Sequence, residues 1–244
     1  MRKTWLLIIV LGLISHPRVV AQQGRYLYKT TLVQAAPGKI LELIDLFKTI
    51  SDEMKQAGTQ SPLWMRHSQG DRWDLLLLFP MGSYGEYYEE GTVARREKSE
   101  QLSKSAQKLK QDIAWQEDVF VYGPPLKNVR RAFDGAGLFH VEMFQSLPGK
   151  QAELYTEREQ ENLYSRSLRQ PENLIFVRDQ GATWDLFTIG CFRDLKHYAE
   201  AGDVSQKDQD AAAKVAGFES ANQIGPYLRT LIALHHDTLA VTVK

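Results

Sequence analysis

The sequence lacks several features by which chemistry is usually recognised. Cys191 is the only cysteine among 244 residues, so no disulfide can form within the chain. We expect it to be a small buried hydrophobe. The 30 basic and 30 acidic residues cancel, which leaves no charge footprint for nucleic acid. HExxH, CxxC, GxSxG and glycine-rich phosphate motifs are also missing. We therefore expect no nucleic-acid partner and predict no metal or cofactor from motifs.

Apolar runs long enough to cross a membrane are missing too. The N-terminus has a basic start at Arg2 and Lys3, a ten-residue apolar run from Trp5 to Ile14, and a small residue at Ala21. This is the layout of a secretory signal peptide, and the run is too short for a bilayer, which needs ~20 residues. We expect residues 1–21 to be a signal peptide on an exported protein, periplasmic or extracellular, with no membrane contact after cleavage. A retained anchor is the alternative.

What the sequence does contain is an internal repeat. GDRWDLLLLF begins at Gly70 and GATWDLFTIG begins 111 residues later, at Gly181. Shifting the chain by 111 residues makes 17 of the 68 positions from 24 to 91 identical, where chance would give about four. Beyond this range the halves slip by eight residues, and Asp118 then aligns with Asp237. The repeat predicts two similar units of domain size.

Each unit indicates the element order β-α-β-β-α-β, the ferredoxin-like arrangement. In the first unit we expect strands at 26–33, 63–67, 73–79 and 119–122, a helix from the Pro-Gly-Lys at 37–39 to Ala57-Gly58, and helical sequence from Ser83 to Lys110. The predicted boundaries are residues 24–123 for repeat 1, 124–134 for a linker and 135–244 for repeat 2.

Two such units in tandem resemble the dimeric α+β barrel superfamily, which includes the antibiotic-biosynthesis-monooxygenase-like proteins. The resemblance rests on element order and duplication, and it covers nearly all of the chain after residue 21. It implies an α+β fold in which two ferredoxin-like sheets pack face to face as a pseudo-dimer within one chain. Two independent domains are the alternative. Members include cofactor-free monooxygenases and haem-handling enzymes, and their ligands usually lie between helices and sheet.

The first helix of repeat 2, Ala152 to Gln170, is polar where its counterpart is apolar. Arg158 replaces Phe47 and Glu161 replaces Ile50. Tyr155 and Glu159 follow one helical face. A polar helix over a sheet either faces solvent or lines a wet cavity. We expect it to face solvent. The functional alternative makes repeat 2 the ligand-binding half.

His140 and Glu142 lie two apart on the first strand of repeat 2, so both project from one face. They could be an oriented base or two metal ligands, but a metal site needs three or four converging groups. His235 and His236 follow near the junction of the last helix and last strand. Adjacent histidines point apart in regular structure, so at most one could join. Ordinary polar contacts are the alternative for all four.

Trp73 and Trp184 are shared by both copies, which favours core packing over a ligand platform. Some haem-degrading members of the superfamily combine a strand Trp with a helix His, as Trp184 and His197 do here. On a helical wheel His197 faces away from the apolar side. Haem is therefore only an alternative. The candidate ligand-binding residues are His140, Glu142, Tyr155, Glu159, Trp184 and His235.

The main functional hypothesis is an exported protein that binds a small apolar or aromatic molecule in a helix–sheet cleft of repeat 2. The alternatives are a cofactor-independent or haem-linked oxygenase, and a non-enzymatic structural or interaction module. No catalytic residue, substrate or oligomeric state follows from the sequence, although a homo-oligomer is compatible with it.

Overall fold

The computed structural model describes residues 26–102 and 104–243. The predicted signal peptide, residues 1–21, lies outside these ranges. Within them, no helix combines the length and the apolar character needed to cross a membrane.

The first half of the described chain has four strands with helices between them. In chain order its elements are β1 (Tyr26–Ala35), α1 (Ile40–Gln56), β2 (Leu63–Gln69), β3 (Leu75–Gly82), α2 (Tyr84–Tyr87), α3 (Glu90–Leu102), α4 (Lys104–Asp112) and β4 (Ile113–Gly123). Two differences from the sequence prediction stand out. The third strand begins at Leu75 rather than Trp73, and the fourth begins six residues earlier than expected, at Ile113.

The second half follows the same strand order after one extra helix, α5 (Leu126–Phe133). Its elements are β5 (Leu138–Ser146), α6 (Gln151–Ser167), β6 (Leu174–Gln180), β7 (Leu186–Phe192), α7 (Leu195–Ala199), the 3-10 helix η1 (Glu200–Asp203), α8 (Gln206–Val215), α9 (Ala221–Arg229) and β8 (Ile232–Thr242). The expected linker, residues 124–134, is therefore largely the helix α5. Its Leu126, Val129 and Phe133 pack against the main core, which explains why it is helical.

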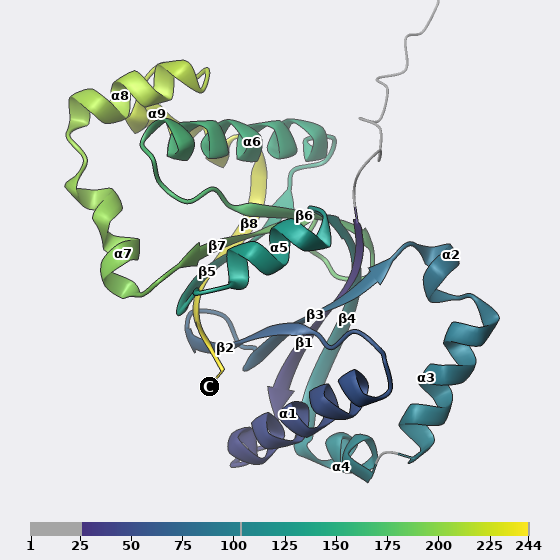
Figure 1. Ribbon diagram of the computed structural model, residues 1–244. Coiled ribbons are helices and arrows are strands. Elements are labelled where there is room, and N and C mark those ends of the chain that lie inside the picture. The colour runs from purple at the N-terminus through teal and green to yellow at the C-terminus, as the bar shows by residue number, and fades with distance from the viewer. Residues whose placement is uncertain (1–25, 103, 244) are drawn as a thin grey trace, which may run out of the picture.

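The strands form one closed antiparallel barrel in the order β1-β3-β2-β8-β5-β7-β6-β4. Figure 1 shows the helices of the two halves on opposite sides of it. The two sheets do not only pack face to face. They are also hydrogen-bonded to each other along both edges. β2 of the first half pairs with β8 of the second, and β4 pairs with β6. Among the described strands, closure leaves no unpaired sheet edge.

Glycines allow the two halves to approach closely at these joints. Gly70 has a φ of +124°, and a Cβ there would lie 2.3 Å from the Asp237 carbonyl oxygen. Gly181 has a φ of +87°, and a Cβ there would lie 2.8 Å from the Asp118 carbonyl oxygen. Both glycines sit in the turn before the Trp-Asp-Leu motif. The shared motif is therefore where each half meets the last strand of the other.

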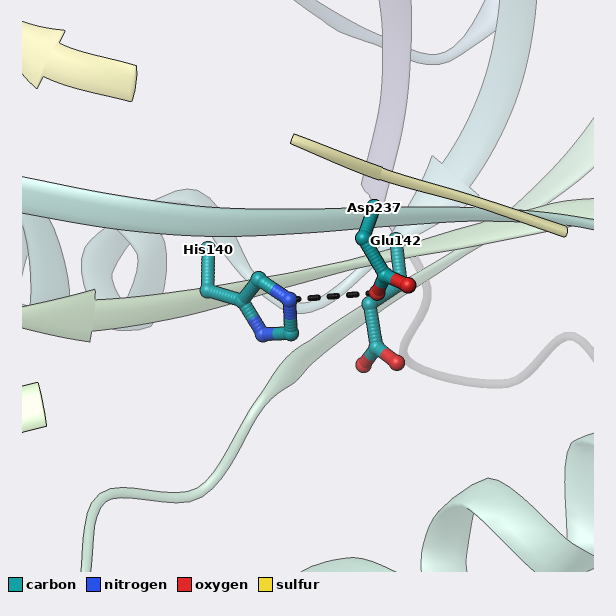
Figure 2. Close-up of side chains that lie close together, drawn as sticks. All are labelled: His140, Glu142 and Asp237. Atoms are coloured by element: carbon teal, nitrogen blue, oxygen red, sulfur yellow. Dashed lines mark hydrogen bonds and ion pairs between the residues drawn. The ribbon is translucent and has the colours of Figure 1, made fainter. Parts of the chain in front are cut away.

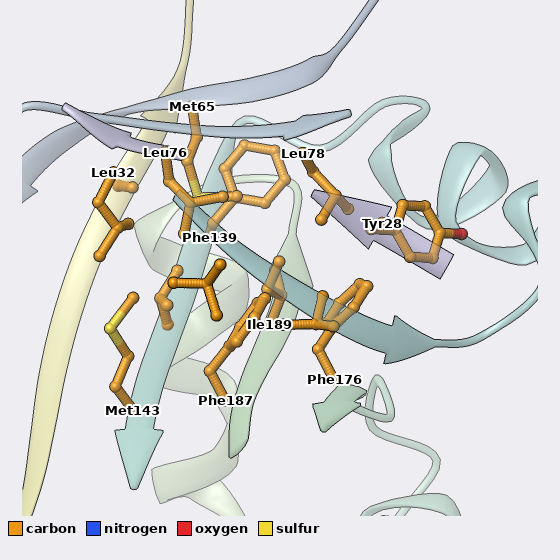
Figure 3. Packing of buried hydrophobic residues seen from close by; sticks show 14 of the residues in the cluster. Tyr28, Leu32, Met65, Leu76, Leu78, Phe139, Met143, Phe176, Phe187 and Ile189 are labelled. Carbon is orange, nitrogen blue, oxygen red and sulfur yellow. The ribbon is translucent and has the colours of Figure 1, made fainter. Parts of the chain in front are cut away.

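The barrel interior is a single apolar core to which both halves contribute. Figure 3 shows Tyr28, Leu76 and Leu78 from the first half meeting Phe139, Phe176 and Phe187 from the second. Most of these side chains are fully buried. Separate apolar clusters lie on the outer faces, where α1 and α4 cover the first sheet and α6 and α9 cover the second.

Candidate functional site

Strand alternation divides the side chains of β5 between two faces of the barrel wall. Phe139 and Val141 are buried in the interior core, so His140 and Glu142 lie on the outer face. β8 runs antiparallel beside β5, and its Asp237 lies directly opposite Glu142. The register therefore places an imidazole and two carboxylates side by side on two adjacent strands.

Asp237 is the centre of this cluster. Its Oδ1 lies 3.2 Å from His140 Nε2, as Figure 2 shows, and its Oδ2 lies 2.8 Å from His235 Nε2. Arg229 Nη1 lies 3.3 Å from His235 Nδ1. Because a guanidinium can only donate, His235 Nδ1 accepts this bond and Nε2 carries the proton donated to Asp237. His235 lies between Arg229 and Asp237 and orients the Asp237 carboxylate.

α6 covers the cluster with a buried arginine. Arg158 is 2% exposed, and its guanidinium lies 4.7 Å above the Phe144 ring. Its Nε donates to Glu157 at 2.6 Å, and its Nη2 donates to Glu161 at 2.6 Å. Its Nη1 lies 3.7 Å from Glu142 Oε2. The prediction that this face of the helix points to solvent was wrong: Arg158 and Glu157 are turned onto the sheet.

Neighbouring carboxylates shift the pKa values of the groups in this cluster. Burial, reinforced by repulsion from Glu157 and Glu142, raises the pKa of Glu161 to about 8 despite its bond to Arg158. Burial by itself would lower the pKa of His140, but the hydrogen bond to Asp237 and the charge of Glu142 outweigh it and raise that pKa. The same hydrogen bond from His140 lowers the pKa of Asp237. The cluster therefore favours positive charge beside Asp237.

Three of the six residues predicted to bind a ligand belong to this cluster: His140, Glu142 and His235. The other three lie elsewhere. Tyr155 packs in the apolar cluster under α6, and Glu159 is exposed on the far side of that helix. Trp184 points into the barrel interior, where it meets the Phe187 ring edge-on, so it cannot contact a ligand on the outer face.

Asp237 and Arg158 are the residues that sequence reasoning did not assign to a site. Asp237 had a signal, because it aligns with Asp118 of the first repeat. His235 lies inside β8 rather than at a helix–strand junction, and His236 points away to Asp71 at 3.2 Å, which fits the expectation that only one histidine joins.

A cavity between helices and sheet lies in the first half. A cleft of about 890 Å³ opens between the outer face of the first sheet and the helices α1, α3 and α4. Apolar side chains form much of its wall, among them Phe47, Ile50, Phe79 and Leu109. This helix–sheet cleft lies in the first half, whereas the prediction placed the ligand-binding cleft in repeat 2. In repeat 2 the equivalent space holds Arg158 and its carboxylates.

Cations stand at the edge of this cleft. Lys29 lies 4.9 Å from the centre of the Phe79 ring and 3.8 Å from Asp118 Oδ1. Arg96 stacks over Tyr87, with its guanidinium carbon 3.7 Å from the ring centre. Its Nη1 donates to the Tyr87 carbonyl at 2.6 Å. These contacts hold two positive charges against an apolar wall.

The two positions differ in the side chains that they could offer to a haem iron. Haem iron takes an axial ligand such as His, Cys, Met or Tyr. No histidine is among the described residues that line the cleft, although Met54, Met81 and Tyr87 are. In the second half, His140 and His235 are engaged with Asp237 beneath the buried Arg158. His197 Nδ1 accepts the Arg193 backbone N–H at 3.2 Å.

Comparison with known proteins gives a match in structure only. No protein-family model matches the sequence, and no curated protein matches it. Among solved structures, a proposed monooxygenase from Fusobacterium nucleatum is 9% identical over 91% of this chain and 94% of its own, with a TM-score of 0.52. A proposed monooxygenase from Lactobacillus acidophilus is 7% identical over 89% and 93%, with a TM-score of 0.51.

A third solved structure, an anthrone oxidase-like protein, is 10% identical, covers 91% of this chain and 92% of its own, and has a TM-score of 0.51. Identities this low establish the fold and leave the chemistry open. The closed barrel of eight described strands agrees with that fold. The chain has the fold of the dimeric α+β barrel superfamily.

Proposed function

We propose that the protein binds a small apolar or aromatic molecule carrying an anionic group in the cleft of its first half. The observation that carries the proposal is the cleft itself, about 890 Å³ between the sheet and α1, α3 and α4. Ligand sites are typically concave and mostly apolar, with a few placed polar groups and volumes of about 300–1,000 Å³. Both the size and the lining fall within that description.

The charges around the cleft support an anionic group on the ligand. Four of its lining residues are basic and two are acidic. The basic ones are Lys29, Arg95, Arg96 and Lys110, and the acidic ones are Glu53 and Glu86. A cation close to an apolar wall attracts a carboxylate more strongly than the same cation would in open solvent. We therefore expect a ring or chain to lie against Phe47 and Phe79, with its anionic group toward Lys29.

A binding assay with matched ligands tests this proposal. Aromatic carboxylates and their neutral amides are compared by calorimetry and by thermal shift, which rises with ligand concentration if the folded state binds. Ile50→Trp fills the cleft and should abolish binding, whereas Leu41→Trp, on an exposed position of the same helix, should not. Lys29→Met should remove the preference for the carboxylate. Equal binding by Ile50→Trp and wild type would refute the proposal.

Oxygen uptake separates binding from turnover. The proposal is a binding function, so we expect no ligand-dependent consumption of oxygen by the purified protein. Measurable uptake in the presence of a bound aromatic ligand would contradict binding alone and favour a cofactor-independent oxygenase that uses the same cleft.

We also propose that the chain is an exported pseudo-dimer: a signal peptide at residues 1–21, ferredoxin-like repeats at 24–123 and 135–244, and a connector at 124–134. The layout of the N-terminus supports export, and the strand order shared by both halves supports the duplication. N-terminal sequencing of the protein produced with its leader should begin at Gln22. An intact Met1 on a cytoplasmic product would contradict export.

A further inference from the structure

We propose that His140, Glu142 and Asp237 form a binding site for one divalent transition-metal cation, with Zn²⁺ and Mn²⁺ as its best probes. This site is separate from the cleft of the first half and does not depend on it. It lies on the outer face of the second half, where β5 and β8 run side by side (Figure 2).

The donor geometry suits a metal. One ligand atom from each of the three residues lies within 4.8 Å of the other two. Donors around a tetrahedral ion with bonds of about 2.1 Å are roughly 3.4 Å apart, so small side-chain rotations suffice. Imidazole with two carboxylates is a ligand set that first-row divalent metals accept. Because two donors face each other across a fixed strand register, the backbone need not move.

Neighbouring groups already orient the donors. Thr188 Oγ1 donates to Glu142 Oε2 at 3.1 Å, and His235 Nε2 donates to Asp237 Oδ2 at 2.8 Å. Each contact holds one oxygen of a carboxylate, and the other oxygen of Asp237, Oδ1, faces His140 Nε2. Such outer contacts fix the orientation of metal ligands and raise metal affinity. The proton between His140 and Asp237 Oδ1 would be displaced as the metal bound.

Carboxylates outnumber guanidinium groups around the proposed site. The connected groups comprise four carboxylates, from Glu142, Glu157, Glu161 and Asp237, and two guanidinium groups, from Arg158 and Arg229. This excess of acidic groups favours a cation over a neutral ligand. The Asp237 side chain is 52% exposed, so an ion can enter from solvent and keep water ligands.

The first half provides an internal comparison. At the position of His140 it has Lys29, and at the position of Glu142 it has Thr31. The Lys29 ammonium lies 3.8 Å from Asp118, the counterpart of Asp237, and Thr31 donates to the same carboxylate. The first half thus carries a built-in cation beside its aspartate. The second half replaces that cation with a ligand and adds a second carboxylate, which is what a site for a free cation requires.

The experiment is metal binding by the intact protein, purified without a histidine tag and stripped with a chelator. Zn²⁺ and Mn²⁺ are titrated separately by calorimetry, and bound metal is counted by elemental analysis. We expect one ion per chain. Glu142→Gln should weaken binding at least tenfold. His140→Lys, which introduces the residue that the first half has as Lys29, should also weaken it at least tenfold. His236→Ala removes the adjacent histidine, which points away to Asp71, and should leave binding unchanged.

Circular dichroism and unfolding midpoints must show that the variants are folded. Glu142→Gln was chosen because glutamine has nearly the same shape as glutamate. Absence of stoichiometric binding in the wild-type protein would overturn the proposal. So would unchanged affinity in both Glu142→Gln and His140→Lys. Binding lost in His236→Ala would also overturn it, because it would place the metal on the other face of β8.

Discussion

Asp74 and Asp185 accept equivalent hydrogen bonds at positions 111 residues apart. Asp74 Oδ2 accepts the Ala35 N–H at 2.8 Å, and Asp185 Oδ2 accepts the Ser146 N–H at 2.8 Å. Each N–H lies just past a register shift at the end of the first strand of its half, where the pairing with the last strand slips. A bulge leaves a backbone donor without a ladder partner. The aspartate of the Trp-Asp-Leu motif supplies that partner.

Replacing Asp185 with alanine should destabilise the protein by about 2–3 kcal/mol, because the buried Ser146 N–H would lose its acceptor. Asp185→Asn keeps an acceptor oxygen and should cost less than half as much. Asp74→Ala should cost less than Asp185→Ala, because Asp185 also accepts from the Ser146 hydroxyl and from Arg178. Urea unfolding measures all three. Equal stability of Asp185→Ala and wild type would contradict this role.

The same carboxylate predicts a dependence of stability on pH. Burial tends to raise the pKa of Asp185, but the hydrogen bonds from Ser146 and Arg178 outweigh it and hold that pKa below its usual range. The ionised form therefore stabilises the fold above the unfolded pKa of about 3.9, and this contribution is lost as pH falls through the lower folded pKa. Urea midpoints between pH 2 and 7 should show wild type and Asp185→Asn converging in acid. A constant difference across that range would contradict the assignment.

Much of the fold was predictable because the repeat is visible in the sequence. The Pro-Gly-Lys triplets mark the start of α1 and α6, and the apolar stripe of α1 predicts its buried face. Barrel closure was not predictable in the same way. Pairing of β2 with β8 joins residues such as Arg66 and Val241, and nothing local in either strand records its partner.

The site was predictable only in part, because the sequence does not show which distant side chains face His140, Glu142 and Arg158. Alternation placed His140 and Glu142 on one face, but the partner of both is Asp237, almost a hundred residues away. Arg158 was expected in solvent because a charged residue is rarely fully buried alone. It is buried because Glu157, Glu161 and Glu142 surround it, and only the fold brings Glu142 to it.

Trp184→Ala should cost about 3–5 kcal/mol in unfolding free energy, because the indole is 8% exposed and packs edge-on against Phe187 in the barrel interior. Trp184 belongs neither to the lining of the cleft nor to the three residues of the proposed metal site. Chemical denaturation and the two binding assays, carried out where the variant is folded, check both statements. Near-wild-type stability together with lost ligand binding would instead assign Trp184 to a site.

Cys191 should behave as an inert thiol. Burial raises its pKa to about 12, and only the thiolate reacts readily. We expect iodoacetamide at pH 8 to modify native protein far more slowly than urea-unfolded protein, and no disulfide-linked dimer to form in air. Mass spectrometry of both samples measures the difference. Equal rates in the two states would show that the side chain is accessible.

The contribution of the buried charged residues of α6 to stability can be tested, because α1 of the first half has apolar residues at the equivalent positions. Arg158→Ala leaves Glu157 buried without its cation and should cost about 3–5 kcal/mol. Replacing Glu157, Arg158 and Glu161 together with Leu, Phe and Ile copies Leu46, Phe47 and Ile50 of α1. This triple variant should be at least as stable as wild type, since well-packed apolar groups often replace buried ion pairs without loss.

Urea unfolding distinguishes the two variants, and Glu153→Gln on the exposed side of α6 serves as a matched control. If the triple variant loses as much stability as Arg158→Ala, the charged network itself holds α6 on the sheet, and the comparison with α1 fails. If the triple variant is stable, the network was retained at no benefit to folding. Its carboxylates would then add negative charge near the proposed metal site without being needed for stability.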